Sequence, residues 1–203
     1  MIVIVDYGVG NVGSIANMLR KAGAPVKIGQ TSEELAGASK LILPGVGAFD
    51  NGISNLRARG FVPTLNELVL ERNVPILGIC LGMHLFARRS EEGQEEGLGW
   101  IDADVVRFHF GVESARLKVP HMGWNSVSVS NGEPSIVPLP SRFYFVHAYH
   151  LACRDDADVE GRTTYGYEFA SVVRRDNIHG VQFHPEKSLR FGMELLKRFW
   201  SGE

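Results

Sequence analysis

The sequence predicts an α/β fold: a central, mostly parallel mixed sheet flanked by helices, with an added antiparallel portion. Two patterns carry this prediction. In the first half of the chain, short apolar runs rich in β-branched residues alternate with segments of helical periodicity, which is typical of βαβ units and of a sheet covered on both faces. In the second half, strand-like runs follow one another without long helices between them. We expect one domain that spans residues 1–203.

The same periodicities predict where the elements lie. Apolar residues recur at helical spacing in residues 12–23, 61–72 and 188–201. The stretch 131–140 contains three prolines and is expected to be a surface loop. The expected strands are residues 2–5, 26–28, 40–43, 75–79, 105–108, 125–129, 143–147, 169–173 and 178–183.

The bulk composition indicates an ordinary globular protein. Apolar residues make up 44% and charged residues 22%, and the formal charge is −2, so nothing favours binding to nucleic acid or to an anionic membrane. We see no signal-like N-terminal segment and no apolar stretch long enough to span a bilayer. Cys80 and Cys153 lie far apart without CxxC spacing, which argues against a disulfide framework or a zinc ribbon. We therefore expect a cytoplasmic protein.

The remaining glycine and histidine motifs predict no cofactor and no metal. Gly8, Gly10 and Gly13 resemble a dinucleotide fingerprint, but the acidic residue expected about 20 positions later falls in a helix start, so a tight turn is the better interpretation. Four histidines are separated in the sequence and lack a neighbouring ligand pair, so we expect ordinary polar or pocket-wall roles for them. They are His109, His121, His147 and His150.

Cys80 is the candidate nucleophile. An apolar run leads into Gly78-Ile-Cys80-Leu-Gly82 and then into a helical pattern, which is the form of a nucleophile elbow. A sharp strand-to-helix turn crowds the backbone, so glycines on both sides remove Cβ atoms that would clash. The start of the helix favours a thiolate, and its free N–H groups, notably that of Leu81, suit an oxyanion. The alternative is a buried structural cysteine, and this motif alone does not decide between the two.

His184 and Glu186 are the candidate base and its partner. His184 lies 184 − 80 = 104 positions after Cys80, at the end of a strand-like run. In extended chain, residues two apart point to the same side, so Glu186 is expected to accept the imidazole N–H and fix its tautomer. These residues complete a minimal set for acyl transfer through a thioester. A surface His–Glu pair is the alternative, but the cysteine motif favours catalysis.

A glycine-rich turn after the run 40–43 adds a third element. Gly45 and Gly47 can adopt positive φ and let the backbone approach a ligand closely. The turn is therefore a candidate source of a second oxyanion N–H, from Val46 or Gly47. A plain turn between strand and helix explains the glycines equally well.

Taken together, the motifs resemble the class I (triad) glutamine amidotransferases, and within them the glutaminase subunits of imidazole glycerol phosphate synthases. The order and spacing of the matching stretches span almost the whole chain. These stretches are Asp6-Tyr-Gly-Val-Gly-Asn11, Pro44-Gly-Val-Gly-Ala-Phe49, Gly78-Ile-Cys-Leu-Gly82, Gly97-Leu-Gly-Trp-Ile101, Lys118-Val-Pro-His-Met-Gly-Trp-Asn125, Tyr144-Phe-Val-His147 and Phe183-His-Pro-Glu-Lys-Ser188.

The resemblance implies a role for each matching residue. Cys80 attacks the side-chain amide of glutamine, His184 shuttles the proton and Glu186 holds His184. The oxyanion hole comprises Leu81, Val46 and Gly47. The implied substrate-binding residues are Gly45, Gly82, His84, Glu92, Ala148 and Tyr149, with Glu92 pairing with the substrate ammonium.

The resemblance also implies a partner. Ammonia passes to a cyclase subunit with a (β/α)8-barrel fold, in a heterodimer that acts in L-histidine biosynthesis, and the glutaminase is nearly silent until the partner binds its own substrate. By position, Met122 and Trp124 are expected at the partner interface, with Tyr144 and Lys187 close by.

Two departures from the family pattern concern the substrate pocket. His84 stands where the family usually has a glutamine that helps to hold the substrate. The family usually reads YFVHSY followed by an aromatic residue. Here Ala148 stands in place of the serine and His150 in place of the final aromatic residue. His84 lies four residues after Cys80, so it is expected to border the pocket, either replacing the lost hydrogen bond or weakening glutamine binding by its bulk.

Three other functions stay open on the sequence. A paralogous glutaminase that supplies ammonia to a surface-sugar-modifying amidotransferase has the same chemistry, and gene neighbourhood separates it from the histidine enzyme. A catalytically weak partner-binding module would retain the three residues while His84 obstructs glutamine. A stand-alone cysteine peptidase or hydrolase is less favoured, because it does not need the stretch 118–125.

Overall fold

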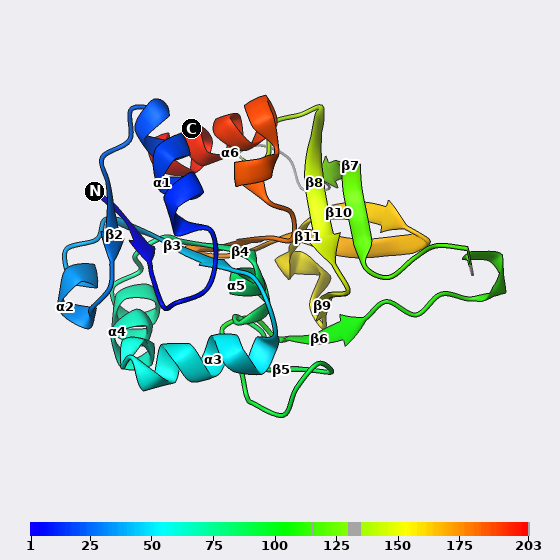
Figure 1. The fold of residues 1–203 in the computed structure, drawn as a ribbon, viewed down its shortest axis with the longest axis horizontal. Coiled ribbons are helices and arrows are strands. Elements are labelled where there is room, and N and C mark those ends of the chain that lie inside the picture. The colour runs from blue at the N-terminus through cyan, green and yellow to red at the C-terminus, as the bar shows by residue number, and fades with distance from the viewer. Residues whose placement is uncertain (115, 130–134, 203) are drawn as a thin grey trace.

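The computed structural model describes residues 1–114, 116–129 and 135–202, and it confirms the α/β class. Figure 1 shows a twisted central sheet with helices above and below it. The strands run in the order β2-β1-β3-β4-β12-β11-β10-β7-β8. No helix among the described residues is long and apolar enough to cross a membrane.

The first five strands in this order form the parallel half of the sheet. Each pairs in parallel with its neighbour, and β4 ends at Cys80. Although β12 is the last strand in the sequence, it pairs with β4, so both ends of the chain contribute to the middle of the sheet. The bounds are β2 Val26–Gly29, β1 Ile2–Val5, β3 Lys40–Gly45, β4 Ile76–Cys80 and β12 Ile178–Val181.

The other strands form the antiparallel portion, as expected. Antiparallel pairs join β12 to β11, β11 to β10, β10 to β7, β7 to β8, and β9 to both β11 and β6; the short β5 is the exception and pairs in parallel with β6. The bounds are β5 Arg89–Ser90, β6 Ala103–Arg107, β7 His121–Val129, β8 Ser141–His147, β9 Tyr149–Cys153, β10 Val159–Tyr165 and β11 Tyr167–Arg175.

Two hydrophobic clusters lie on opposite faces of the sheet, and β1 shows how the sequence divides between them. Its residues alternate, because successive strand side chains point to opposite faces. Val3 and Val5 pack with the cluster that includes α3, α4 and α5, whereas Ile2 and Ile4 pack with α1 and α6. The helices are α1 Val12–Lys21, α2 Ser32–Leu35, α3 Phe49–Ala58, α4 Phe61–Asn66, α5 Leu81–His84 and α6 Leu189–Ser201.

The helices differ from the expected ones in two places. The segment expected as one helix over 61–72 divides into α4 and a π-helical turn, Glu67–Glu71. The helix α3 was not expected, because Gly52 and the polar residues around it dilute the apolar pattern. Gly52 allows close packing, since a Cβ there would lie 3.2 Å from the Leu81 and Leu85 side chains.

The predicted loop 131–140 is only partly within the described residues. Residues 131–134 lie outside them, and 135–140 form no helix or strand. Three strands, β5, β9 and β10, were not expected. In β10 the apolar alternation is interrupted by Glu160 and Gly161, although β10 forms a hairpin with β11, the next strand in the sequence, and also pairs with the more distant β7.

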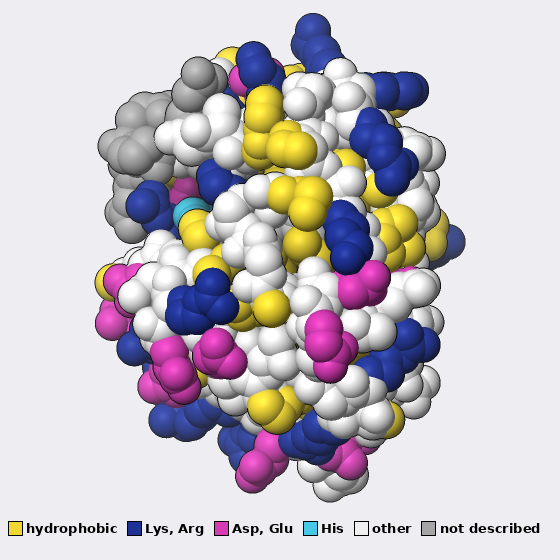
Figure 2. Space-filling model, turned by 90° about the vertical axis from the view of Figure 1, so that its left-hand side faces the viewer, with side chains coloured by type: hydrophobic (Ala, Val, Ile, Leu, Met, Phe, Trp, Pro, Cys, Tyr) yellow, Lys and Arg dark blue, Asp and Glu magenta, His cyan; other side chains and the backbone are white. Residues whose placement is uncertain are grey.

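At one end of the sheet, β2 is an edge strand beside α1. Figure 2 shows this face of the molecule, where hydrophobic side chains gather in the upper half and charges of both signs are interspersed below. On the edge strand, Lys27 pairs with Glu34 of α2 at 3.2 Å. A charged residue on an edge strand opposes pairing with another chain.

Candidate active site

Cys80 lies at a strained turn between β4 and α5. Its φ is 53° and its ψ is −110°, a combination that non-glycine residues rarely adopt and that characterises a nucleophile elbow. A Cβ on Gly78 would lie 2.5 Å from the Phe86 ring, and one on Gly82 would lie 1.8 Å from the Leu43 carbonyl oxygen. The predicted need for both glycines is confirmed. The helix that follows, α5, is a single turn.

His184 and Glu186 form the expected hydrogen-bonded pair. His184 Nδ1 lies 2.8 Å from Glu186 Oε1, and both side chains are only 2% exposed. The expected backbone was wrong: residues Pro185–Lys187 form a 3₁₀ turn and not extended chain. The tight turn folds the carboxylate back beside the imidazole. Nδ1 donates to the carboxylate, so Nε2 is left to face the thiol.

Strand pairing brings the imidazole to the sulfur. Parallel strands β4 and β12 are adjacent, with Ile79 opposite Val181, so the residues that follow both strands emerge at the same edge of the sheet. Ser188 holds the His184 segment in place: its hydroxyl donates to the His184 carbonyl at 2.6 Å and accepts from the Tyr144 N–H at 2.9 Å. The side chains of Cys80 and His184, which are 104 positions apart in the sequence, are therefore in contact.

The electrostatics of the site favour a charged pair. Burial lowers the pKa of His184, but the Cys80 thiol and the Glu186 carboxylate outweigh burial and raise that pKa above its ordinary value. Nε2 of His184 is buried and has no other hydrogen-bond partner among the described residues. The geometry therefore suits an imidazolium that faces a thiolate, a pair that can attack a carbonyl and then protonate the leaving nitrogen.

A cavity of about 430 Å³ opens beside Cys80 and His184. Most of the predicted substrate-binding and oxyanion residues line it, but Gly45, Gly82 and Glu186 lie behind its wall. A groove of about 730 Å³ between β7, β8 and α6 is larger, but Cys80 does not line it. The residues that line the first cavity are Val46, Gly47, Ala48, Cys80, Leu81, His84, Glu92, Pro120, Val146, His147, Ala148, Tyr149 and His184.

The glycines of the turn after β3 serve different purposes. Gly47 has φ +101°, as predicted. Gly45 does not have positive φ, so that expectation was wrong. Gly45 is required for space: a Cβ there would lie 2.6 Å from the Tyr7 hydroxyl and 2.8 Å from the Leu81 Cβ. Val46 is 45% exposed and lies at the cavity wall.

Glu92 reaches the cavity from the loop after β5. Its Oε2 accepts a hydrogen bond from the Phe49 N–H at 2.9 Å, at the start of α3, and its own N–H donates to Ser90 Oγ at 3.0 Å. Asp50 fixes the following residues by accepting from the N–H groups of Gln94 and Glu95. One carboxylate oxygen of Glu92 thus holds the loop to α3, and the side chain lines the cavity.

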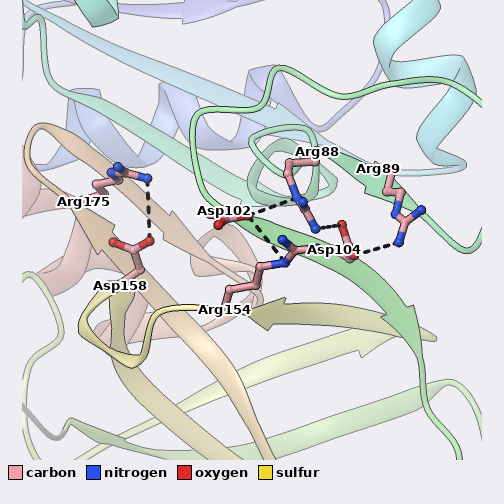
Figure 3. A network of polar contacts seen from close by, with 7 residues as sticks. All are labelled: Arg88, Arg89, Asp102, Asp104, Arg154, Asp158 and Arg175. Atoms are coloured by element: carbon pink, nitrogen blue, oxygen red, sulfur yellow. Dashed lines mark hydrogen bonds and ion pairs between the residues drawn. The ribbon is translucent and has the colours of Figure 1, made fainter.

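An ion-pair network supports the base of the same loop. Figure 3 shows Asp102 between Arg88 and Arg154, and Asp104 between Arg88 and Arg89. The Arg88–Asp104 contact is 2.7 Å and the Arg88–Asp102 contact is 3.1 Å. Because the pairs share partners, they act as a network and fix β5 against β6 more firmly than isolated surface pairs.

The histidines beside the cavity have polar and pocket-wall roles, as expected, with His147 in the cavity wall, but their clustering was not expected. His121 and His147, which are 26 positions apart, lie with Nδ1 and Nε2 only 3.0 Å from each other. His147 Nδ1 donates to the Tyr149 carbonyl, so its Nε2 accepts from His121, and Asn125 in turn donates to His121. Similarly, His150 donates to the Leu151 carbonyl and accepts from a tyrosine hydroxyl. Every ring in this arrangement is neutral.

Stability is expected to fall as the pH falls below 6.5, because buried neutral histidines resist protonation. Burial lowers the pKa values of His84, His121 and His179 to about 4, and that of His147 well below its ordinary value. The unfolded chain takes up protons near pH 6.5 and the folded chain does not, so the stabilisation is complete above pH 6.5 and is lost toward pH 4. The pKa of His184 is raised, so this residue favours the folded chain as the pH falls, but the four histidines with lowered pKa values outweigh it.

Urea unfolding at pH 7.0 and pH 5.0 measures this effect. The free energy of unfolding is expected to be lower at pH 5.0 by about 2 kcal/mol or more. Equal values at both pH values would contradict the neutral assignment of the cluster.

Several pocket residues were missed in the sequence. Ala48, Pro120 and Val146 line the cavity, and Gln182 lies buried beneath it. Pro120 and Val146 belong to stretches that match the family, but nothing in their chemistry singles them out. Only strand pairing places them beside Cys80.

Glu186→Gln is expected to reduce turnover by about 10³-fold, with little change in folding. An amide can donate to Nδ1 and so favour the tautomer that turns an N–H toward the thiol. Steady-state kinetics measure this loss of turnover, with Glu194→Gln on the exposed side of α6 as control. Undiminished turnover would remove Glu186 from the catalytic set.

Fold and site together define a class of protein: an α/β enzyme whose candidate nucleophile is a cysteine at a strand-to-helix turn, with a buried His–Glu pair beside it. Residues 3–201 match the family described as glutamine amidotransferase class-I. The chain belongs to this family.

Relatives resemble the chain over almost its whole length. One from Pseudomonas aeruginosa is 50% identical over 201 residues, covers 98% of both chains and is described as imidazole glycerol phosphate synthase subunit HisH 2. One from Methanococcus maripaludis has the same description, identity and coverage. A relative from Leptospira interrogans, described as subunit HisH, is 43% identical over 203 residues, with 99% and 100% coverage.

Solved structures share the fold. One described as a glutamine amidotransferase has a TM-score of 0.73 at 21% identity and covers 99% of each chain. Another, described as PurLQS from Thermotoga maritima, has a TM-score of 0.73 at 17% identity, with coverage of 99% of this chain and 97% of its own. These structures support the mixed α/β architecture.

Proposed function

We propose that this chain is the glutaminase subunit of an imidazole glycerol phosphate synthase, a single domain over residues 1–203 that hydrolyses glutamine to glutamate and ammonia in the cytoplasm. The observation that carries the proposal is the buried arrangement of Cys80, His184 and Glu186 at a cavity that Glu92 also lines. The relatives that carry this description support it over the whole length of the chain.

The geometry supports a thioester mechanism. The Cys80 sulfur attacks the side-chain amide carbon of glutamine, and the negative charge that develops on the oxygen is held by the N–H groups of Leu81 and of the Val46–Gly47 turn. His184 gives its proton to the departing nitrogen, so ammonia leaves and an acyl-enzyme remains. His184 then takes a proton from water, which attacks the thioester and releases glutamate.

The ends of glutamine need separate partners in the cavity. The Glu92 side chain suits the substrate ammonium, since a carboxylate pairs with it directly. Behind the wall, Gly45 and Gly82 provide backbone without side chains. Ala148 and Tyr149 offer wall contacts; the Ala148 carbonyl accepts from Phe108 N–H at 3.1 Å, so it already has a partner.

A partner surface is proposed where β7 and β8 meet the turn after His184. Met122 is 62% exposed and Trp124 is 40% exposed, which is high for large apolar side chains. The Trp124 and Tyr144 ring centroids are 6.3 Å apart, and Lys187 Nζ lies 5.9 Å from the Tyr144 ring centroid. An exposed aromatic and methionine cluster beside a cation is typical of an interface centre. The proposed partner is the cyclase subunit with a (β/α)8-barrel fold.

The proposal is tested by glutamate release from the purified chain, alone and with the cyclase and its phosphoribosyl ligand. Strong stimulation by the liganded partner, lost in Cys80→Ala, is the expected result. Stable binding without glutamate release would favour a partner-binding module, and absence of binding would remove the histidine-pathway assignment.

Trp124→Ala is expected to weaken binding to the cyclase by about 2 kcal/mol, roughly 30-fold, because a half-exposed indole buries much apolar area in a complex. Isothermal titration measures the change. Leu70→Ala is a matched control, since Leu70 is 50% exposed but belongs to the turn after α4, away from the proposed surface. If both variants bind the cyclase with equal affinity, the interface does not include this part of β7.

A second candidate is a paralogous glutaminase that supplies a surface-sugar-modifying amidotransferase. The two relatives at 50% identity carry the number 2 in their descriptions, and His84, Ala148 and His150 depart from the usual pattern. Parallel assays with a histidine-pathway cyclase and with a sugar-modifying partner separate the two candidates by which one stimulates glutamate release.

A further inference from the structure

Gln182 joins the pocket histidine to the nucleophile. It follows β12 directly and is completely buried. Its Oε1 lies 2.8 Å from His84 Nε2, and its Nε2 lies 3.9 Å from the Cys80 sulfur, a long N–H···S contact. The Gln182 backbone N–H donates to the Ser171 carbonyl at 2.9 Å, which fixes where the side chain starts. The carboxamide therefore spans the space between His84 and Cys80.

The direction of this chain of contacts follows from its donors and acceptors. A carboxamide has one accepting oxygen and one donating nitrogen. A sulfur with negative charge accepts, so the nitrogen faces Cys80 and the oxygen faces His84. His84 Nε2 must then donate. Burial lowers the pKa of His84 to about 4, so the ring is neutral near pH 7 and its proton is on Nε2.

We propose that His84 is a positioning residue that locks the Gln182 carboxamide with its N–H toward Cys80, so that the thiolate is stabilised before any acyl group arrives. Without a donor at position 84, the amide is free to turn by 180° and to present its oxygen to the sulfur, which repels negative charge. The two residues thus act as one unit. The inference rests on the proposed role of Cys80 as nucleophile.

The other ionisable groups nearby act on Cys80 or His84 without a hydrogen bond to His84. His184 and Tyr7 act on Cys80: burial and then the Cys80 charge raise the pKa of Tyr7, so it stays neutral. His147 and His150 act on His84 through space, but both rings bond elsewhere in the cluster. Gln182 is therefore the group that accepts the hydrogen bond from His84.

Alkylation of Cys80 by iodoacetamide tests the unit in the isolated full chain. The rate is measured against pH, and mass spectrometry of the Cys80 peptide separates it from Cys153, whose own profile is an internal control. Gln182→Met removes the amide, His84→Phe keeps the ring without a donor, and His84→Gln keeps a donor. The Met and Phe variants are expected to raise the pH of half-maximal rate by about one unit, and the Gln variant to leave it in place.

The double variant distinguishes a relay from simple packing. His84→Phe combined with Gln182→Met is expected to shift the profile no further than Gln182→Met alone, because His84 acts through Gln182. Additive shifts, unchanged profiles in both single variants, or equal shifts in His84→Phe and His84→Gln would overturn the proposal. Thermal melting checks that each variant is folded, and His84→Leu is a second donorless variant if His84→Phe is not.

The readout needs neither glutamine nor a partner. If the chain fails to release glutamate but shows these shifts, the result supports the positioning role of His84 and contradicts the proposed function. The reverse outcome, stimulated glutamate release with unchanged alkylation profiles, retains the function and removes the positioning role of His84.

Discussion

Replacing His184 with alanine is expected to lower glutamate release in the activated complex by about 10⁴-fold. The substitution removes both the group that faces the thiol and the proton donor for the leaving ammonia, so the attack and the departure are slowed together. The His184 backbone N–H still donates to the Tyr144 carbonyl at 2.9 Å, so the segment is expected to stay in place. Steady-state glutamate release at saturating glutamine measures the loss.

A matched control is His109→Ala. The His109 side chain is 78% exposed and 3.9 Å from Glu91, outside the cavity, so its removal should leave turnover unchanged. Binding of the His184→Ala chain to the cyclase should also match the native chain. A loss of less than tenfold in turnover would mean that another base serves Cys80.

Gly82→Ala is expected to destabilise the chain by about 4 kcal/mol, among the largest effects of a single methyl group. The added Cβ would lie 1.8 Å from the Leu43 carbonyl oxygen, which belongs to the central strand β3 and cannot move without disturbing the pairing of β3 with β4. Chemical denaturation measures the free energy of unfolding. Where the variant still folds, the Cys80 turn is displaced and turnover falls as well.

Gly13→Ala provides the control for this prediction. Gly13 is also in a helix, but its Cβ position has no atom within 4 Å, so alanine is expected to stabilise α1 by about 0.5–1 kcal/mol through helix propensity. A similar response at Gly13 and Gly82 would show that α5 packs against β3 loosely enough to accept a methyl group.

Local chemistry made Cys80 and the His184–Glu186 pair predictable. The elbow depends on glycines two residues on each side of the cysteine, and the pair is two residues apart, so each signal lies within a short stretch. The prediction of the pair held although the predicted backbone conformation was wrong. A 3₁₀ turn and an extended chain both bring the carboxylate beside the ring at this spacing.

Contacts between distant strands were not predictable in the same way. The His121–His147 contact requires the register of β7 against β8, and nothing near either residue encodes that register. Gln182 shows the same limitation. In the sequence it is one polar residue in an apolar run, and its purpose becomes evident only when β12 is placed beside β4 and α5.

The central position of β12 has a consequence for how the chain acquires its shape during synthesis. The ribosome delivers β4 long before β12, yet β12 fills the gap between β4 and β11. Until residues 178–201 have emerged, β4 has one open edge and the surface that receives α6 is uncovered. Contacts of such long sequence separation form late because loop closure is costly. The nascent chain therefore stays incomplete, and without its imidazole beside the sulfur, until residues 178–201 have emerged.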